Sequence, residues 1–268
     1  MDPKDAQTTL RRLLGRSTQR VDEVTAAPLA ALAATLDRDD RPPLPGDAVP
    51  PLGHWLFFWP LAPTSGVERD GEAGRHADLL PPEWPQRQWT GGRLRFHHAL
   101  HVGDEVLRQS RVLQAEPLPE GGARVTLLHE ITNAQGLALA EEQEVVCRAA
   151  AARVGQPRQP APAQADFARL LTPGAVLLFR YAALRFDSRA EHQAQVPPAL
   201  LVTLALDLLQ RARPAVQLLG LDFALLRAVP AGQPLRLGGR CDGPRHVALW
   251  AQDAAGLLAL QLHAECGA

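Results

Sequence analysis

This chain of 268 residues lacks an excess of either charge, with 28 Lys and Arg against 29 Asp and Glu. A net charge of −1 argues against nucleic acid or an anionic membrane as a partner, since both need a concentrated basic surface. No apolar run reaches the ~18 residues that cross a bilayer, and the first residues lack the apolar stretch of a secretory signal. We therefore expect neither nucleic acid nor a membrane among the partners.

Cysteine is scarce, and no metal-ligand spacing such as CxxC is present. The odd number of three unpatterned cysteines favours reduced thiols and a cytoplasmic protein. Dinucleotide-binding, P-loop, GxSxG and HExxH motifs are also missing, which removes the commonest nucleotide, hydrolase and zinc interpretations. Three histidines in residues 97–101 have no second ligand pattern beside them, so we expect no metal site.

A weak internal repeat is present instead. Residues 94–106 align with residues 223–235 at an offset of 129, and residues 132–140 align with 252–260 at an offset of 120. The first pair reads as strand, glycine turn and strand, and the second pair as a hairpin opened by Asn133 or Asp253. Alternating apolar runs flank both hairpins, so each half is expected to end in an antiparallel meander.

The sequence predicts one helix that is buried on all sides. Residues 199–213 are apolar on nearly every side, after prolines suited to a first helical turn, so this helix must be enclosed. A bent antiparallel sheet around a central helix is the hotdog fold. The corresponding segment of the first half, residues 54–63, contains two prolines that permit only a short helix, and residues 21–39 predict an additional amphipathic helix.

The predicted fold class is therefore α+β, a double hotdog of two tandem units. We expect an N-terminal hotdog with a helical extension in residues 1–148, a linker rich in Ala, Pro and Gln in residues 149–166, and a C-terminal hotdog in residues 167–268. Such a chain already contains the usual pair of hotdog units, so it is expected to be a monomer, or a homodimer through exposed sheet edges.

The candidate chemistry lies in residues 179–192, FRYAALRFDSRAEH, which read as a short strand followed by Asp187 and His192. A carboxylate and an imidazole can share one water molecule and move its protons at neutral pH. Alone, Asp187 is most simply a turn or helix-capping residue and His192 a solvated loop residue. Taken together, five positions apart in the chain, the two residues suggest general acid–base catalysis as the more specific hypothesis.

Four segments together resemble the MaoC-like hydratases and dehydratases, in the double-hotdog branch of hydroxyacyl-thioester dehydratases and mesaconyl-CoA hydratases. They are PPLGHWLFF at 50–58, LPPEWPQRQWTGGRLRF at 80–96, EEQEVVCR at 141–148 and LLFRYAALRFDSRAEH at 177–192. The resemblance implies that the second half carries the catalytic pair, which falls on Asp187 and His192. It also implies addition or removal of water at the α,β bond of an acyl thioester, with CoA favoured over acyl-carrier protein and no metal or redox cofactor.

The chain departs from this family after His192. Relatives have a longer loop with a His-Gly-Pro turn, whose backbone N–H stabilises the enolate oxygen. Here Val196, Pro197, Pro198 and Ala199 follow, and proline has no N–H to donate. An alternative function is therefore a catalytically silent double hotdog that binds acyl-CoA or scaffolds a partner.

The expected acyl-CoA site draws on both halves of the chain. Asp207 inside the long helix suggests a third possibility, a thioesterase, although a solvent or backbone partner is the simpler expectation for this carboxylate. In a strand Arg180 and Tyr181 would face opposite sides, so at most one of the two, Tyr181, would line the pocket. Core packing and exposed charge remain the plain alternatives for the candidate substrate-binding residues, which are Tyr181, Phe58, Trp89, Gly92 and Arg93.

Overall fold

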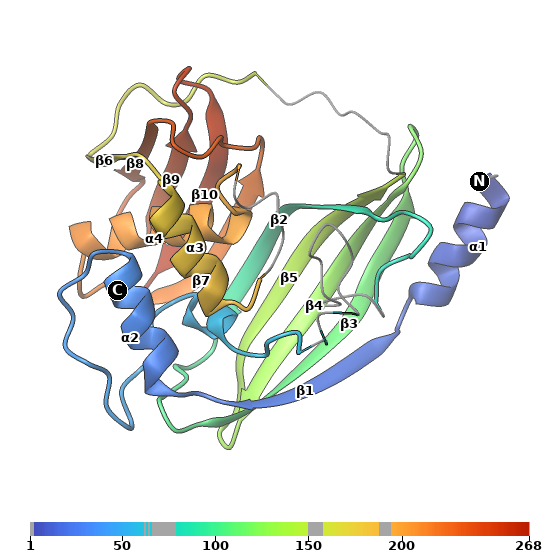
Figure 1. Cartoon of the computed structure of the whole chain (residues 1–268), viewed down its shortest axis with the longest axis horizontal. Helices are drawn as coiled ribbons and strands as arrows, with labels where there is room; N and C mark the ends of the chain where they lie inside the picture. Colours follow the sequence, from blue (N-terminus) through green and yellow to red (C-terminus); the bar gives the residue numbers. More distant parts are fainter. Residues whose placement is uncertain are drawn as a thin grey trace.

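A computed structural model describes residues 3–61, 63, 65, 79–149, 158–187 and 194–267. Within these residues ten strands form one antiparallel sheet, with helices packed against one face of it (Figure 1). No helix of this described part is long and apolar enough to cross a membrane. In chain order the elements are α1 (Pro3–Leu13), β1 (Ser17–Glu23), α2 (Ala26–Thr35), the 3₁₀ turn η1 (Gly53–Leu56), β2 (Gln86–Phe96), β3 (Glu105–Pro117), β4 (Ala123–Asn133), β5 (Gly136–Arg148), β6 (Phe167–Leu171), α3 (Ala175–Leu184), α4 (Pro198–Ala212), β7 (Leu218–Leu225), β8 (Leu235–Cys241), β9 (His246–Gln252) and β10 (Leu258–Cys266).

The sheet confirms the internal repeat. Its strand order is β1-β3-β4-β5-β2-β7-β10-β9-β8-β6, so the second half repeats the first half in mirror order about the β2–β7 junction. At that junction Gly91 to Arg95 pair with Ala224 to Gly220. Glycine is needed there because a Cβ on Gly91 would lie 2.7 Å from the backbone oxygen of Phe223. The domain bounds drawn from the sequence stay a prediction.

The two predicted hairpins are also confirmed. In the β4–β5 turn, Asn133 Oδ1 accepts the N–H of Gln135, and Gly136 has φ 105°. In the β9–β10 turn, Asp253 Oδ1 accepts two backbone N–H groups, and Gly256 has φ 75°. Asx side chains and left-handed glycines therefore set the register of both meanders, as the repeat predicts.

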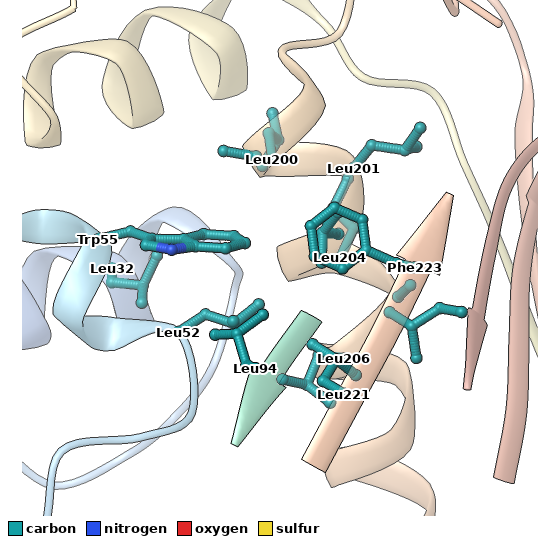
Figure 2. Packing of buried hydrophobic residues seen from close by; sticks show 14 of the residues in the cluster. Leu32, Leu52, Trp55, Leu94, Leu200, Leu201, Leu204, Leu206, Leu221 and Phe223 are labelled. Carbon is teal, nitrogen blue, oxygen red and sulfur yellow. The ribbon is translucent and has the colours of Figure 1, made fainter. Parts of the chain in front are cut away.

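The enclosed helix is α4, and every residue from Ala199 to Leu209 is buried. It contacts four strands of the second half, β6, β8, β9 and β10. Figure 2 shows Leu200 of α4 on the side of Trp55 of η1, and Leu204 beside the ring of Phe223 of β7. The corresponding helix of the first half is only the four-residue turn η1, as its prolines predicted.

Two expectations about secondary structure are wrong. Residues 177–184 form helix α3 rather than a strand, and the only buried members of α3, Leu178 and Tyr181, are three positions apart. The helix expected in residues 21–39 is shorter, because residues 17–23 alternate between exposed and half-buried and form β1 before α2 begins. Helix α1, which the sequence did not suggest, packs against β3.

Candidate active site

Asp187 is placed by the turn that ends α3. The N–H groups of Arg185 and Asp187 both donate to Ala182 O, and Phe186 has a positive φ of 50°. This left-handed residue breaks the helix and turns the chain away from the α3 axis, leaving Asp187 half-buried. His192, the other half of the predicted pair, lies outside the described residues, so the pairing stays a prediction.

Tyr181 faces inward from α3 and is 1 % exposed. Its hydroxyl lies 3.0 Å from Thr203 Oγ1 on α4, and Thr203 donates to Ala199 O one turn earlier. The buried Arg185 lies over two rings, 5.8 Å from the centroid of Tyr181 and 5.9 Å from that of Trp55. These contacts fix the turn that carries Asp187 against both α4 and η1.

A second aromatic contact supports the same turn. The Trp59 ring is stacked on Phe186 at a centroid distance of 5.6 Å, and Trp59 Nε1 donates to Leu184 O at 3.1 Å. Phe186 immediately precedes Asp187 in the chain. The segment after η1 therefore lies directly beside the candidate acid–base residue.

The predicted substrate-binding residues divide between the two faces of the sheet. Phe58 and Trp89 lie on the inner face with Tyr181, and Trp89 makes edge contacts with Trp55 at 5.4 Å and Phe223 at 5.3 Å. The space beside Gly92, where we expected a ligand, is taken by the Phe223 ring, 3.0 Å from an ideal Cβ. Their roles in substrate binding remain predictions.

Arg93 is on the outer face, away from Tyr181, Phe58 and Trp89. Its Nε donates to Asp222 Oδ1 at 2.7 Å, and its side chain is 55 % exposed. It lines a polar hollow of about 310 Å³ together with Glu142, Glu144 and Asp222. An outward arginine of this kind is remote from the side chains that surround Tyr181.

The sequence analysis missed a buried polar band across the inner face of the first half. Ser110 on β3, His129 on β4 and Glu141 on β5 are direct cross-strand neighbours, and all three are no more than 3 % exposed. Apolar side chains lie on both sides of the band, with Ile131 and Leu139 in one core cluster and Leu127 and Val145 in another. The signal was available in the alternation of β4 and β5, which places His129 and Glu141 on the apolar face.

Glu141 is the centre of this band. Its carboxylate accepts Trp55 Nε1 at 3.0 Å, His54 Nε2 at 3.1 Å and Gln143 Nε2 at 2.7 Å. Burial acts to raise the pKa of Glu141, but the bonds and charges of His54, His129 and Gln143 outweigh burial and lower that pKa to about 2. The carboxylate is therefore ionised at neutral pH, and it holds Trp55 in its place between Trp89 and Arg185.

For His129, burial outweighs the attraction of the neighbouring carboxylate. Its Nδ1 lies 2.7 Å from Ser110 Oγ, and burial lowers its pKa to about 4, with Glu141 opposing and Arg108 adding to that shift. The imidazole is therefore neutral at pH 7. The inner face of the first half therefore carries one buried negative charge, on Glu141, next to an uncharged imidazole.

The low pKa of His129 predicts a pH-dependent stability. Below pH 6.5 the unfolded chain binds a proton that the native chain binds only near pH 4, so the free energy of unfolding falls across this interval, by on the order of 3 kcal/mol. In His129→Leu this component should be missing, whereas the exposed His246→Leu should retain it. Urea unfolding at pH 7.5, 6.0 and 5.0 measures the difference, and equal pH slopes for wild type and His129→Leu would contradict it.

The start of α4 supplies few hydrogen-bond donors. The Val196 N–H is already bonded to Val229 O at 2.8 Å, and Pro197 and Pro198 have no N–H. The Leu201 N–H closes the first turn on Pro197 O, which leaves Ala199 and Leu200 as the residues whose N–H groups face the helix start. The start of α4 thus offers two backbone donors, the N–H groups of Ala199 and Leu200.

Asp207 was expected to reach solvent or a backbone partner, and that expectation is wrong. The carboxylate is 1 % exposed and forms ion pairs with Arg38 at 3.1 Å, Arg169 at 2.9 Å and Arg211 at 2.7 Å. Three arginines from separate parts of the chain fix this group in place. A carboxylate so constrained is unsuited to act as the nucleophile or base of a thioesterase.

No group of three His, Cys, Asp or Glu side chains in the described parts of the chain is arranged to hold a metal ion. Near the end of β2, His97 is exposed and His98 Nδ1 lies 3.1 Å from Ala99 O. The expectation that no cofactor is needed stays a prediction.

Comparison with known proteins identifies the family. The family model for hydroxyacyl-thioester dehydratase type 2 matches residues 52–192, just over half of the chain. The chain belongs to this family. It is also 31 % identical over 271 aligned positions to mesaconyl-C(4)-CoA hydratase of Chloroflexus aurantiacus, covering 95 % of this chain and 96 % of that protein.

Solved structures with this architecture support the fold of this dehydratase-family chain. A MaoC-like dehydratase from Phytophthora capsici matches with a TM-score of 0.65 at 11 % identity, covering 96 % of this chain and 97 % of that one. A Mycobacterium tuberculosis protein described as a double hotdog matches with a TM-score of 0.57 at 16 % identity, covering 94 % and 96 %. The double-hotdog prediction is confirmed.

Proposed function

We propose that this protein adds water across the α,β double bond of an acyl-CoA thioester, or catalyses the reverse elimination. The observation that carries the proposal is the likeness to mesaconyl-C(4)-CoA hydratase along nearly the whole of both chains. The position of Asp187 supports it, because the turn that ends α3 carries this half-buried carboxylate directly after Phe186, whose ring stacks on Trp59 of the first half. A catalytic residue of the second half is thus held next to the half of the chain that is proposed to bind the acyl group.

In the proposed hydration, Asp187 and His192 hold one water molecule. The water oxygen forms a bond to Cβ of the enoyl thioester while one of the two side chains accepts a water proton. The α,β double-bond electrons move toward the thioester carbonyl, and the other side chain delivers a proton to Cα. Atoms and charge balance with water as the sole co-reactant, so the proposed reaction needs neither a metal nor a redox cofactor.

The enolate-like oxygen that develops on the thioester needs a hydrogen-bond donor. The N–H groups of Ala199 and Leu200 at the start of α4 are the proposed donors, because the positive end of a helix dipole also favours a developing negative charge. Thr203 and Tyr181, which are bonded to each other, hold α3 against this part of the helix. We propose that the inner-face residues Phe58 and Trp89 contact the acyl group.

The proposal is tested by mixing the purified protein with crotonyl-CoA and with mesaconyl-CoA. Hydration removes the conjugation between the double bond and the thioester carbonyl, so the ultraviolet absorbance of the enoyl thioester should fall with time. The reverse reaction is followed with the matching 3-hydroxyacyl-CoA. A folded sample that turns over no enoyl-CoA and dehydrates no 3-hydroxyacyl-CoA would reject the proposed function.

A second candidate function is favoured by the start of α4. With the Val196 N–H bonded to Val229 O and two prolines following, the protein could bind acyl-CoA without reaction. This function predicts that CoA thioesters raise the melting temperature while no hydration is detected. A hydratase rate that is abolished in His192→Ala would exclude it.

A further inference from the structure

An ionised carboxylate in an apolar interior calls for an explanation. Glu141 on β5 is 2 % exposed and keeps its negative charge at neutral pH. Burying a charge costs free energy unless the bonds that it forms outweigh its loss of hydration. Both carboxylate oxygens lie 3.0 Å from Trp55 Nε1, and one lies 3.1 Å from His54 Nε2. Gln143 on the same strand is a further donor, so two of the three donors belong to η1 and the buried charge is directed at that turn.

Trp55 connects this carboxylate to the turn that carries Asp187. Trp55 is 5 % exposed, and the guanidinium of Arg185 lies 5.9 Å from its ring centroid, within reach of a cation–π contact. A carboxylate that accepts the indole N–H adds electron density to the ring, so it strengthens the attraction between the ring and a cation. The charge of Glu141 thus acts on Arg185 through the tryptophan that both of them contact.

Arg185 is part of the catalytic turn itself. It is 7 % exposed, and its N–H and that of Asp187 both donate to Ala182 O. Its guanidinium also lies 5.8 Å from the ring centroid of Tyr181. A displacement of this arginine therefore displaces the backbone that carries Asp187, two residues further along the chain.

The same arginine reaches the start of α4 through Tyr181. The Tyr181 hydroxyl lies 3.0 Å from Thr203 Oγ1, which donates to Ala199 O at 2.8 Å. The N–H groups of Ala199 and Leu200 are the proposed donors to the enolate oxygen. The residues that connect Glu141 to the start of α4 are each no more than 7 % exposed, so solvent screens their interactions little.

We propose that Glu141 is a positioning residue for the reaction, which acts through Trp55 and Arg185 to hold Asp187 and the start of α4 at the distance that hydration requires. A positioning residue acts on other residues rather than on the substrate. The first half then takes part in catalysis as well as in binding the acyl group. This inference rests on the proposed function and gives the first half a second role in it.

Glu141→Gln removes the charge and keeps the shape of the side chain. The amide oxygen can still accept the Trp55 N–H, but a hydrogen bond to a neutral group is roughly half as strong as one to an ionised group. We expect kcat for crotonyl-CoA or mesaconyl-CoA, whichever is hydrated faster, to fall ~10-fold, while KM changes less than ~2-fold. A raised KM at an unchanged kcat would assign Glu141 to acyl binding and overturn the inference.

A double-mutant cycle shows whether Trp55 transmits the effect. Trp55→Phe keeps an aromatic ring beside Arg185 but lacks the N–H that Glu141 accepts. In this background Glu141→Gln should change kcat by less than ~2-fold, because the connection to Arg185 is already absent. A further ~10-fold loss in the double variant would mean that the carboxylate acts on the reaction by another route, which contradicts the proposal.

Glu130→Gln is the matched control. Glu130 is on the adjacent strand β4 but alternates with the inward-facing His129 and Ile131, and its side chain is 33 % exposed, 3.9 Å from Arg111. Its kcat and KM should equal those of the wild type. All variants are assayed well below their melting temperatures, so that unfolded protein does not account for a loss of kcat. An equal loss in Glu130→Gln would remove the specific role of the buried carboxylate.

Amide hydrogen exchange measures the positioning without any reaction. The N–H groups of Arg185 and Asp187 are bonded to Ala182 O, and we expect them to exchange ~10-fold faster in Glu141→Gln because the turn is held less firmly. The N–H of Arg213, which closes the last turn of α4, should exchange at an unchanged rate. NMR resolves the individual amides, and unchanged exchange at Arg185 and Asp187 would overturn the inference.

These outcomes separate the inference from the proposed function. If the wild type turns over no thioester, the proposed function fails, and exchange at the α3 turn still decides whether Glu141 holds that turn. If the wild type is a hydratase and Glu141→Gln retains its full kcat, the inference fails and the proposed function stands.

Discussion

Replacing His192 with alanine is expected to lower kcat for hydration of an enoyl-CoA by ~10³-fold, because a positioned acid–base group typically contributes 10²–10⁴-fold. Asp187→Ala should cause a loss of similar size, since the two side chains are proposed to act on one water molecule. KM should change little, as neither residue is expected to contact the CoA moiety. Initial rates followed by thioester absorbance measure both effects.

His97→Ala is the matched control for His192→Ala, because His97 is an exposed histidine away from the α3 turn. Its kcat should equal that of the wild type. The double variant Asp187→Ala/His192→Ala should be hardly slower than either single variant, since residues that act as a unit are not additive. An undiminished rate in His192→Ala would show that this histidine is not part of the catalytic pair.

The largest loss of stability is expected from Asp207→Ala. The substitution leaves Arg38, Arg169 and Arg211 close together without their shared carboxylate, although each arginine remains partly exposed. Removal of one partner from a buried ion pair costs 3–5 kcal/mol, and the partial exposure of these arginines favours the lower end. The free energy of unfolding should therefore fall by about 3 kcal/mol, measured by urea denaturation.

Asp242→Ala removes a carboxylate from a solvent-exposed ion pair with Arg240 and serves as the control. Exposed pairs contribute little, so no measurable change is expected there. If Asp207→Ala unfolds at the same urea concentration as the wild type, the three-arginine cluster does not hold α4 to β6 and to the segment that follows α2. Thioesterase activity that depends on Asp207 would also contradict the constrained role assigned to this carboxylate.

The sequence was sufficient where the signals were local. The all-round apolar character of α4 and the Asx-Gly hairpins are each contained in a few consecutive residues, the repeat is visible because each of its segments is such a local pattern, and the structure confirms all three. The α3 segment was misassigned because a short apolar run fits a strand as well as a helix, and only the burial of Leu178 and Tyr181 at helical spacing separates the two.

The missed parts of the candidate site depend on contacts between distant residues. Ser110, His129 and Glu141 become neighbours only when three strands pair in one register. The partners of Asp207 come from positions 38, 169 and 211, and no pattern in the sequence connects them. The acid–base role of Asp187 stays a prediction from the sequence, whereas the buried charged groups at Glu141 and Asp207 required the fold.

Because both copies of the hotdog unit are in one chain, the inner faces of the two halves can change independently in evolution. The offsets of 129 and 120 place Gly239 and Leu249 at the positions equivalent to Ser110 and His129, and Leu262, the strand partner of Leu249, takes the place of Glu141 in this row. In an assembly of two identical hotdog subunits, a charge introduced into one lining would appear in both. Joining the copies in one polypeptide removes that obligation, so the inner face of one half can stay apolar while the inner face of the other carries ionisable groups such as His129 and Glu141.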